Sequence, residues 1–294
     1  KDRNMQAMIF AAGLGTRLKP LTDSMPKALV RVGGKPMIEH VIMKLKDAGV
    51  GRIVVNVHHF AGQIKSFLAA NDNFGVDIRV SDESEMLLET GGGIKKAAPL
   101  FSPDEPVLIH NVDILSNVDL RKFYDSSTGN DATLLVSDRK TRRYLLFDDG
   151  MTLRGWTNVE TGEVKMKNEE CRMKNDNYNN EAMPCGCVND NSSLNNNDNS
   201  NEALSGVCAN DNSSFFILHS SFKKFAFSGI HIFSPRLFPL LENYPDKFGI
   251  MDFYLGADSG ANIKGYLKND LRLMDVGKLD TLKDAEEFLK ECDM

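Results

Sequence analysis

Residues 8–27 read MIFAAGLGTRLKPLTDSMPK, a continuous apolar run that leads directly into a glycine-containing loop. The run at residues 8–12 is typical of a strand that is covered on both faces, because no polar side chain interrupts the apolar ones. Gly13 and Gly15 follow at once, and glycine allows left-handed backbone angles and a close approach of N–H groups to an anion. The stretch therefore predicts a buried strand that ends in an anion-binding loop.

The same loop carries a hydroxyl group and two cations, on Thr16, Arg17 and Lys27. The planar guanidinium of Arg17 can hold phosphate oxygens through two parallel hydrogen bonds, whereas Lys27 supplies a compact, mobile charge. A phosphate group suits this combination. From these residues alone, a strand-to-helix turn with surface cations stays open as the alternative.

Two familiar nucleotide-binding motifs are absent from the sequence. The dinucleotide-binding pattern needs a third glycine where Leu18 stands, which argues against an NAD-dependent dehydrogenase. The pattern G-x-x-x-x-G-K-[ST] occurs nowhere in the chain. The loop must therefore belong to another class of phosphate-binding site.

The spacing of apolar residues indicates alternating helices and strands. Apolar positions recur at intervals of three and four over residues 36–48, which predicts an amphipathic helix, and residues 52–57 form a β-branched run. A second helix is expected around residues 64–68 and a further strand at residues 76–80. This alternation predicts an α/β fold with a parallel sheet.

Two later segments also place polar groups at strand ends. Residues 106–112 read as another buried strand, and Asp113 follows it where open α/β sheets bind ligands. Residues 88–93, LETGGG, precede a helix expected to begin near Ile94. The bare backbone of three glycines at a helix N-terminus could hold a flat ring or a phosphate, although a flexible hinge is the alternative.

The string AAGLGTRLKPLT, followed by PKALV, resembles the signature of the nucleotidyltransferases that activate sugar 1-phosphates. The form LETGGG is similar to the branch of that family that acts on N-acetylmuramic acid 1-phosphate. The resemblance resumes at residues 226–233 and 272–277 and covers nearly the whole chain except residues 168–214. It implies a Rossmann-like, mostly parallel sheet flanked by helices, of the glycosyltransferase-A-like type, in one domain over residues 5–294.

The resemblance also implies roles for individual residues. The family's motifs correspond to catalytic residues Arg17 and Lys27, nucleotide-binding residues Ala12, Gly13, Gly15, Thr16, Glu89, Thr90, Gly91 and Asn111, a sugar-binding Gly229, and the Mg²⁺ ligands Asp113 and Asp275. Two positions depart from the family's pattern. Val112 stands where a glycine usually precedes the first aspartate, and Lys278 replaces the usual threonine after the second.

The reaction that the resemblance implies is transfer of a nucleotidyl group from a nucleoside triphosphate to a sugar 1-phosphate. We expect UTP and N-acetylmuramic acid 1-phosphate as the substrates. Mannose-1-phosphate guanylyl transfer and cytidylyl transfer to phosphocholine remain alternatives. A non-catalytic nucleotide-sugar sensor should lack the aspartates or Lys27, and this chain has all three.

The composition fits a soluble globular protein that does not bind nucleic acid. Hydrophobic residues make up 41% of the 294 residues and charged residues 26%, and the formal net charge is −6, which disfavours a nucleic-acid surface. No apolar run approaches the roughly 20 residues of a membrane span. The polar first residues lack the apolar centre of a signal peptide. We therefore expect a cytoplasmic monomer or small homo-oligomer.

Residues 168–214 differ from the rest of the chain. They contain 14 asparagines with many aspartates and serines and few large apolar side chains. Such a composition buries too little apolar surface to offset the entropy of ordering the chain, so we predict a poorly ordered, low-complexity insertion. Cys185 and Cys187 leave a metal site open there, although reduced thiols are the simpler interpretation.

Overall fold

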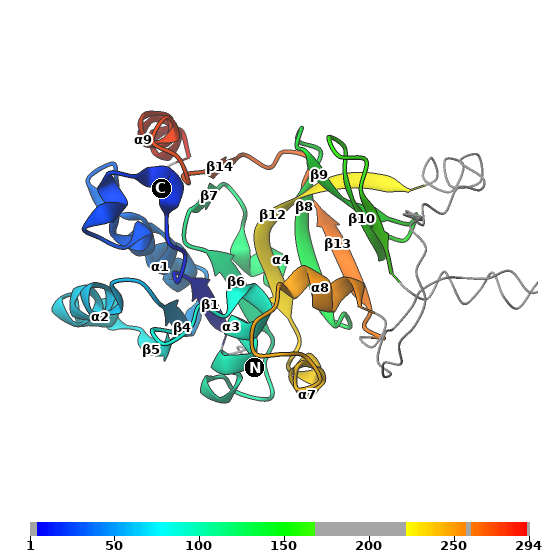
Figure 1. Ribbon diagram of the computed structural model, residues 1–294, viewed down its shortest axis with the longest axis horizontal. Coiled ribbons are helices and arrows are strands. Elements are labelled where there is room, and N and C mark those ends of the chain that lie inside the picture. Colours follow the sequence, from blue (N-terminus) through cyan, green and yellow to red (C-terminus); the bar gives the residue numbers. More distant parts are fainter. Residues whose placement is uncertain (1–4, 168–221, 257–259, 293–294) are drawn as a thin grey trace, which may run out of the picture. The chain divides into compact units, whose positions relative to one another are not determined.

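The strand expected at residues 8–12 is β1 (Met5–Phe10), which lies between β6 and β4 inside a ten-stranded sheet (Figure 1). The computed structural model describes residues 5–167, 222–256 and 260–292. The insertion expected at residues 168–214, with Cys185 and Cys187, lies outside the described residues. In spatial order the main strands are β11 (Val164–Met166), β10 (Leu153–Asn158), β9 (Arg143–Phe147), β12 (Lys223–Phe233), β6 (Val107–Asn111), β1, β4 (Val50–Val57) and β5 (Asp77–Asp82), while β8 (Ala132–Ser137) pairs with β12 and with β13 (Ile263–Leu267).

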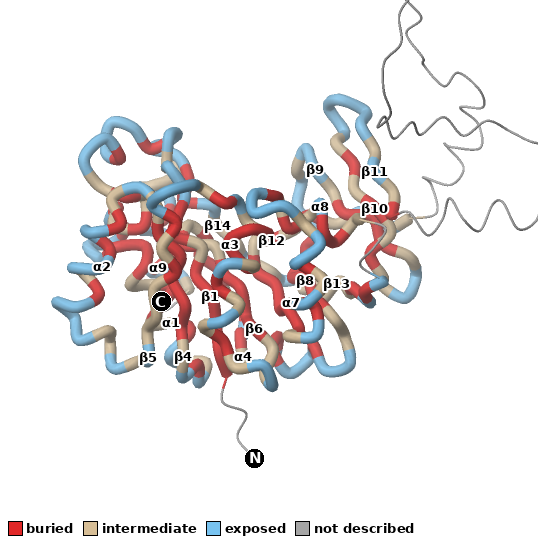
Figure 2. The backbone as a smooth tube through the Cα atoms, turned by 60° about the horizontal axis from the view of Figure 1, so that its bottom comes forward, coloured by how far each residue is buried: buried red, intermediate tan, exposed pale blue. Residues whose placement is uncertain are grey.

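Helices cover both faces of this sheet, and the strands between them are buried (Figure 2). The helices on one face are α1 (Met37–Asp47), α2 (Ala61–Ala70), α4 (Leu120–Asp125) and α9 (Thr281–Glu291), and those on the other are α3 (Glu89–Ala97), α7 (Phe238–Leu241) and α8 (Ile250–Leu255). Along β1 the side chains alternate, so that Ile9 packs into the first cluster and Met8 into the second. This double covering explains the continuous apolar run.

The order of the parallel strands creates a binding crevice. Strands β5, β4, β1 and β6 are all parallel to their neighbours. The chain leaves β1 toward β4 and β5, and then returns through α3 to β6 on the opposite side of β1. The connections therefore diverge between β1 and β6, where open α/β sheets bind ligands. The predicted α/β class, with a mostly parallel central sheet flanked by helices, is confirmed.

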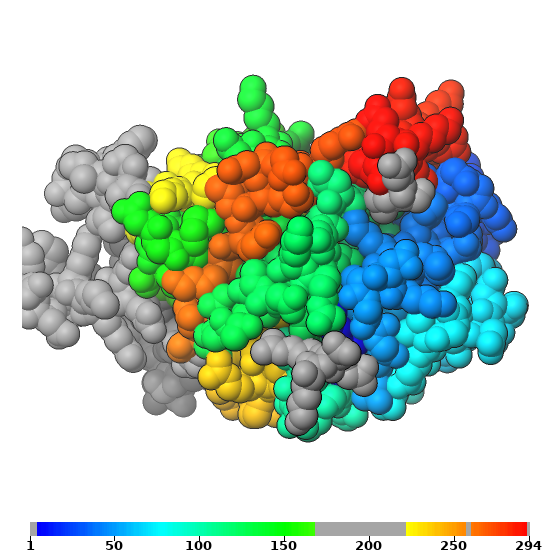
Figure 3. Space-filling model, turned by 180° about the vertical axis from the view of Figure 1, so that it is seen from behind, coloured from blue at the N-terminus to red at the C-terminus, as the bar shows by residue number. Residues whose placement is uncertain are grey.

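Beyond β6 the sheet changes direction, which the sequence did not predict. Strand β12 runs antiparallel to β6, β8 and β9, and β9, β10 and β11 continue as an antiparallel extension. The short strands β7 (Ile114–Ser116) and β14 (Leu273–Asp275) form a separate antiparallel pair. From behind, helix α9, red in Figure 3, lies beside the blue N-terminal part of the chain. Among the described residues no helix is long and apolar enough to cross a membrane.

The glycine run at residues 91–93 is helical, which corrects the expected helix start near Ile94. Helix α3 begins at Glu89, and all three glycines are buried inside it. A Cβ on Gly91 would lie 2.3 Å from the Phe248 ring, and one on Gly92 would lie 2.0 Å from the Asp246 carbonyl oxygen. The Phe248 carbonyl accepts from the N–H groups of Gly91 and Gly92, at 2.9 and 3.2 Å. The glycines therefore serve close packing.

His231 gives the folded state a sensitivity to acid. Its side chain is 2% exposed, and among the described residues neither ring nitrogen has a hydrogen-bond partner. Burial lowers the pKa of His231 from 6.5 to about 3. Between these pKa values the unfolded chain binds a proton that the folded chain does not, so stability falls as the pH falls below 6.5.

We predict that His231→Phe reduces this loss. At pH 5 the protonation penalty of His231 is about 2 kcal/mol, whereas at pH 8 it is absent. The difference in unfolding free energy between pH 8 and pH 5, measured by urea denaturation, should shrink by that amount in the variant. The effect of the substitution on packing is the same at both pH values, so it cancels when the unfolding free energies at pH 8 and pH 5 are subtracted. An unchanged difference would mean that His231 is hydrated or charged in the folded protein.

Candidate active site

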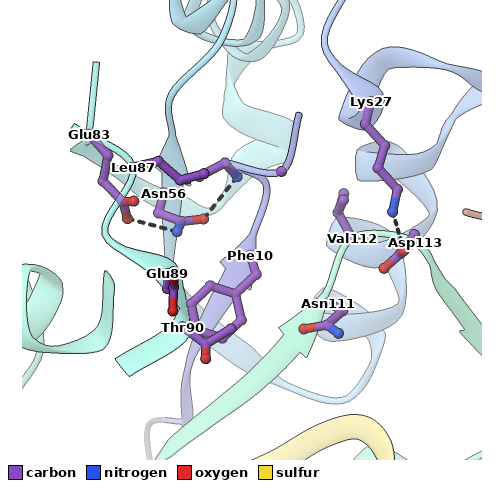
Figure 4. A pocket seen from close by; sticks show the side chains of 12 residues that line it. Phe10, Lys27, Asn56, Glu83, Leu87, Glu89, Thr90, Asn111, Val112 and Asp113 are labelled. Atoms are coloured by element: carbon purple, nitrogen blue, oxygen red, sulfur yellow. Dashed lines mark hydrogen bonds and ion pairs between the residues drawn. The ribbon is translucent and has the colours of Figure 1, made fainter. Parts of the chain in front are cut away.

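A pocket of about 450 Å³ opens at the carboxyl ends of the parallel strands (Figure 4). Its walls come from the ends of β1, β4 and β6 and from the segment between β5 and α3. The lining residues are Phe10, Ala12, Gly13, Lys27, Asn56, Glu83, Leu87, Glu89, Thr90, Asn111, Val112 and Asp113. We call this the first pocket.

The loop after β1 needs Gly15 to fold back on itself. Gly15 has φ 65°, and a Cβ there would lie 2.9 Å from Cγ2 of Thr22 and 3.0 Å from Cβ of Lys27. The Thr22 hydroxyl donates to the Gly15 carbonyl at 2.8 Å. This close turn brings Lys27 next to the loop's glycines. A left-handed angle and a lack of space both select glycine at this position.

A buried hydrogen-bond network joins the loop after β1, which the sequence predicts to bind an anion, to the segment after β5. The Asn56 side-chain oxygen accepts from Ala11 N at 2.7 Å and from Ala12 N at 3.3 Å. Its amide donates to Oε1 of Glu83 at 2.8 Å, and Oε2 of Glu83 accepts from Leu88 N at 3.2 Å. Burial raises the pKa of Glu83, while the bonds from Asn56 and Leu88 act in the opposite direction. The network fixes both rims of the first pocket.

We predict that Asn56→Ala lowers the free energy of unfolding by about 1–3 kcal/mol, because it leaves buried partners of the amide unsatisfied. Asn71→Ala is the matched control, since Asn71 is exposed and, among the described residues, its side chain bonds only to the Phe67 carbonyl in the last turn of α2. The control should change stability by less than about 0.5 kcal/mol. Equal effects of the two substitutions, measured by chemical denaturation, would show that the network does not stabilise the fold.

Lys27 and Asp113 form an ion pair at the edge of the first pocket (Figure 4). Each side chain is 13% exposed, so the pair is largely shielded from water. Asp113 follows β6, and Lys27 comes from the loop that follows β1. The fold thus brings the cation and the first predicted aspartate together.

The second predicted aspartate is held next to the first by strand pairing. Asp275 of β14 pairs with Ile114 of β7, and Val276 N donates to the Asp113 carbonyl at 2.8 Å. Asp275 itself accepts at Oδ1 from Gly277 N at 2.8 Å. The pairing therefore brings the backbones of two aspartates from distant parts of the sequence next to each other.

This donor set suits Mg²⁺. No cluster of three or more His, Cys, Asp or Glu side chains able to hold a metal occurs in the described part of the chain. Mg²⁺ is usually held by one or two carboxylates and completes its shell with water and substrate phosphate oxygens. Asp113 and Asp275 could provide two such carboxylates, whereas a structural zinc site would need more protein ligands.

Asp275 also lines a second, larger pocket of about 1050 Å³. Arg17 lines this pocket too. The side chains of Arg17 and Asp275 both lie close to Gly277, since a Cβ on Gly277 would be 2.7 Å from Nη2 of Arg17 and 2.6 Å from Oδ1 of Asp275. The other lining residues are Arg139, Lys140, Thr141, Arg142, Arg143, Tyr144, Leu145, Trp156, Phe227, Met251 and Lys278. We call this the cationic pocket.

The structure brings together most of the residues that the sequence singled out. The first pocket contains Ala12, Gly13, Lys27, Glu89, Thr90, Asn111 and Asp113, and the cationic pocket contains Arg17 and Asp275. Gly229 lines neither pocket, but a Cβ there would lie 2.7 Å from Nδ2 of Asn111.

Three further predicted residues also lie outside both linings. Gly15 shapes the loop, Thr16 is exposed in the short helix Thr16–Leu18, and the Gly91 N–H is bonded to Phe248. Sequence reasoning missed Asn56, Glu83 and the Arg139–Arg143 segment. The one signal for Asn56 in the sequence is that it is a polar residue inside the β-branched run at residues 52–57.

Comparison with known proteins identifies a matching family model and relatives that match part of the chain. Residues 6–144 match the family model described as Nucleotidyl transferase. The chain is 49% identical over 109 residues to N-acetylmuramate alpha-1-phosphate uridylyltransferase of Caulobacter vibrioides, which covers 36% of this chain and 45% of the relative. It is 39% identical over 138 residues to mannose-1-phosphate guanyltransferase of Gibberella zeae, which covers 45% and 37%. The chain spans about half the length of the curated relatives it matches, or less.

Solved structures with the same fold extend over nearly the whole chain. HddC from Yersinia pseudotuberculosis, complexed with GMP-PN, has a TM-score of 0.65 at 21% identity and covers 97% of this chain and 99% of its own. The inositol-1-phosphate CTP transferase from T. maritima has a TM-score of 0.65 at 13% identity and covers 99% and 97%. At these identities the likeness shows the fold alone.

Proposed function

We propose that the protein transfers a nucleotidyl group from a nucleoside triphosphate to a sugar 1-phosphate, because residues 6–144 match the family model described as Nucleotidyl transferase. The observation that carries the proposal is the Lys27–Asp113 ion pair at the edge of the first pocket, together with the strand pairing that brings the backbone of Asp275, a residue of the cationic pocket, next to Asp113. One pocket then takes the nucleotide and the other the acceptor. The reacting phosphates meet at the aspartates.

The first pocket suits the nucleotide. Ala12 and Gly13 offer a loop backbone at the carboxyl end of β1, and the Asn56–Glu83 network fixes that loop relative to the segment before α3. Glu89, Thr90 and Asn111 line the remainder and provide polar groups for the base and the ribose. The Thr90 hydroxyl already accepts from Ile250 N at 2.9 Å, so its contact with a base would use the remaining hydrogen-bonding capacity.

The reaction needs charge neutralisation and alignment more than a protein nucleophile. An oxygen of the sugar phosphate attacks the α-phosphorus, the new phosphoanhydride bond forms, and the bond to the β-phosphate breaks so that pyrophosphate leaves with the electron pair. Lys27 neutralises negative charge at the α-phosphate, and Arg17 neutralises charge on the phosphate groups at the mouth of the cationic pocket. Gly13, Gly15 and Thr16 of the loop orient the triphosphate.

Asp113 and Asp275 would hold a Mg²⁺, which when bound supplies positive charge between the two phosphate-bearing substrates. The ion pair between Lys27 and Asp113 holds the carboxylate in place beside the site. Asp275 is exposed and keeps one oxygen on Gly277 N, which fixes the direction of the carboxylate.

We propose UTP and N-acetylmuramic acid 1-phosphate as the substrates. The support is the LETGGG form of residues 88–93 and the relatives with that activity at 49% and 41% identity. Guanylyl transfer to mannose 1-phosphate is the second candidate, because a relative of that name matches at 39% identity.

A matrix of substrates tests the proposal. UTP, GTP, CTP, ATP and dTTP are each combined with the 1-phosphates of N-acetylmuramic acid, N-acetylglucosamine, mannose and glucose, with Mg²⁺, and pyrophosphate release is measured. We expect UTP with N-acetylmuramic acid 1-phosphate to give the highest rate. A preference for GTP with mannose 1-phosphate would overturn the substrate proposal but not the reaction class.

A further inference from the structure

One short segment of the chain contacts the walls of both pockets. Residues 246–251 lead into α8, and Met251 at their end lines the cationic pocket. The same residues pack on the start of α3, where Glu89 and Thr90 line the first pocket (Figure 4). We call residues 246–251 the bridging segment. It connects the two pockets, and the proposed reaction gives it no role.

The bridging segment is hydrogen-bonded to the start of α3. The Phe248 carbonyl accepts from Gly91 N at 2.9 Å and from Gly92 N at 3.2 Å, and Phe248 N donates to the Leu88 carbonyl at 3.3 Å. Phe248 is 6% exposed, so these bonds form where little water competes for them and where the low local dielectric strengthens them. The start of α3 and the bridging segment therefore move together.

Thr90 joins the bridging segment to the first pocket through its side chain. Its hydroxyl oxygen accepts from Ile250 N at 2.9 Å, and Ile250 is 3% exposed. A hydroxyl has one donor and two acceptor sites, so Thr90 can still donate its hydrogen to a ligand in the first pocket. Ile250 immediately precedes Met251. A single chain of hydrogen bonds can therefore run from a ligand in the first pocket to the backbone beside the cationic pocket.

A ligand in the first pocket should strengthen this chain. A hydroxyl that donates a hydrogen bond becomes a better acceptor, because hydrogen bonds in a chain polarise one another. The bond from Ile250 N to Thr90 then holds Met251 more firmly, and a second ligand that contacts Met251 loses less conformational entropy on binding. The expected coupling between the two pockets is therefore positive.

The wall of the first pocket depends on its contact with the bridging segment. Glu89 has a left-handed φ of 63°, which is unfavourable for a residue with a side chain and persists only where the surroundings hold it. The ion pair between Glu89 and Lys247, at 3.8 Å, contributes little because both side chains are about half exposed. The buried bonds of Phe248 and Thr90 therefore hold this part of the wall.

We propose that Thr90 is a positioning residue that couples the two pockets, so that a nucleotide bonded to its hydroxyl raises the affinity of the cationic pocket for the sugar 1-phosphate. This inference rests on the proposed function for the identity of the two ligands and adds an interaction between their sites. Coupling between sites usually changes an affinity by about five- to 150-fold, and one chain of hydrogen bonds belongs at the lower end. By linkage, the sugar 1-phosphate raises the affinity for the nucleotide by the same factor.

Calorimetric titration measures the coupling without turnover. The dissociation constant of N-acetylmuramic acid 1-phosphate is measured without nucleotide and with saturating α,β-methylene UTP, whose methylene group prevents release of pyrophosphate. The analogue should lower this dissociation constant by about five- to tenfold in the parent and in Thr90→Ser, and by less than about twofold in Thr90→Val. Because the analogue is saturating, a weaker affinity of a variant for the nucleotide does not affect the ratio. The GTP analogue and mannose 1-phosphate replace these probes if guanylyl transfer gives the higher rate.

Hydrogen exchange gives a readout at the bond itself. The nucleotide analogue alone should slow exchange of the Ile250 amide in the parent and in Thr90→Ser, but not in Thr90→Val. Thr128→Val is the matched control, because Thr128 is exposed, its hydroxyl donates to the Asp125 carbonyl at 3.1 Å, and it lies in neither pocket. The control should match the parent in both measurements.

The outcomes separate the inference from the proposed function. If the analogue leaves the affinity for the sugar 1-phosphate unchanged, or changes it equally in the parent and in Thr90→Val, the inference is wrong, and nucleotide transfer by the same protein leaves the proposed function standing. Coupling without pyrophosphate release from any pair of substrates counts against the proposed function alone. Failure of the parent to bind either pair of ligands contradicts both. The parent's affinity ratio and its Ile250 exchange test the inference even if Thr90→Val does not fold.

Discussion

Asp113→Asn is expected to lower kcat for pyrophosphate release by about 10²- to 10³-fold, the usual cost of removing one preorganised electrostatic group from an active site. The substitution keeps the shape of the side chain and the backbone bond from Val276 N to the Asp113 carbonyl. It removes the negative charge that pairs with Lys27 and that would bind a metal beside Asp275. The protein should therefore remain folded and lose turnover.

The measurement is a Mg²⁺ titration of steady-state rates, with circular dichroism to check folding. Asp270→Asn is the control, because Asp270 is an exposed aspartate that pairs with Lys268 and lies in neither pocket. It should retain the parent rate. Near-parental Mg²⁺-dependent turnover in Asp113→Asn would remove Asp113 from the site.

Gly92→Ala should lower the free energy of unfolding by about 3 kcal/mol or more, at the upper end of what overpacking a tight core costs. The added Cβ would lie 2.0 Å from the Asp246 carbonyl oxygen and 3.0 Å from Cβ of Leu88. Backbone atoms cannot move aside as the end of a flexible side chain can. Relief therefore requires α3 to separate from the segment at residues 246–248.

Gly62→Ala provides the opposite case on another helix. Gly62 lies in α2, it is exposed, and nothing approaches within 4 Å of the position of its Cβ. Alanine there should raise stability by roughly 0.5–1 kcal/mol through helix propensity and the unfolded state. Chemical denaturation of both variants and the parent protein measures the two changes in unfolding free energy. Two changes of the same sign would show that the contact at Gly92 does not limit packing.

The strands around the site could be predicted because each carries its own signal. The apolar runs expected at residues 52–57 and 76–80 are β4 and β5, and the one expected at residues 106–112 is β6. A strand buried on both faces needs apolar residues throughout, so its sequence reveals it without knowledge of its neighbours. The direction of β12 depends on pairing with β6 and β8, which no local pattern encodes.

The start of α3 could not be predicted, because its cause lies far away in the chain. Glycine is a poor helix former, so the three glycines in residues 88–93 favour a helix that begins only near Ile94. The Phe248 carbonyl bonds to the first N–H groups, and the ring of Phe248 fills the space that side chains would take. Tertiary packing overrides local propensity here.

The candidate site was predicted in part for a similar reason. Lys27, Asp113 and Asp275 stand in family motifs, but the ion pair between Lys27 and Asp113 and the β14–β7 pairing that places Asp275 depend on the fold. The segment at residues 139–143 belongs to no such motif, and a run of charges usually forms a solvated surface. Only the packing of the segment against Phe227 makes it the wall of a pocket. The roles of all these residues remain predictions.

The most direct test of nucleotidyl transfer is to follow the α-phosphate of the nucleotide. The protein is incubated with Mg²⁺, N-acetylmuramic acid 1-phosphate and UTP labelled at the α-phosphate, and the products are separated and counted. We predict that the label appears in a sugar nucleotide, with one pyrophosphate released per labelled product, and only when both substrates are present. Label released as UMP without the sugar phosphate, or label that stays in the triphosphate with every nucleotide and sugar phosphate tried, would contradict nucleotidyl transfer by this protein.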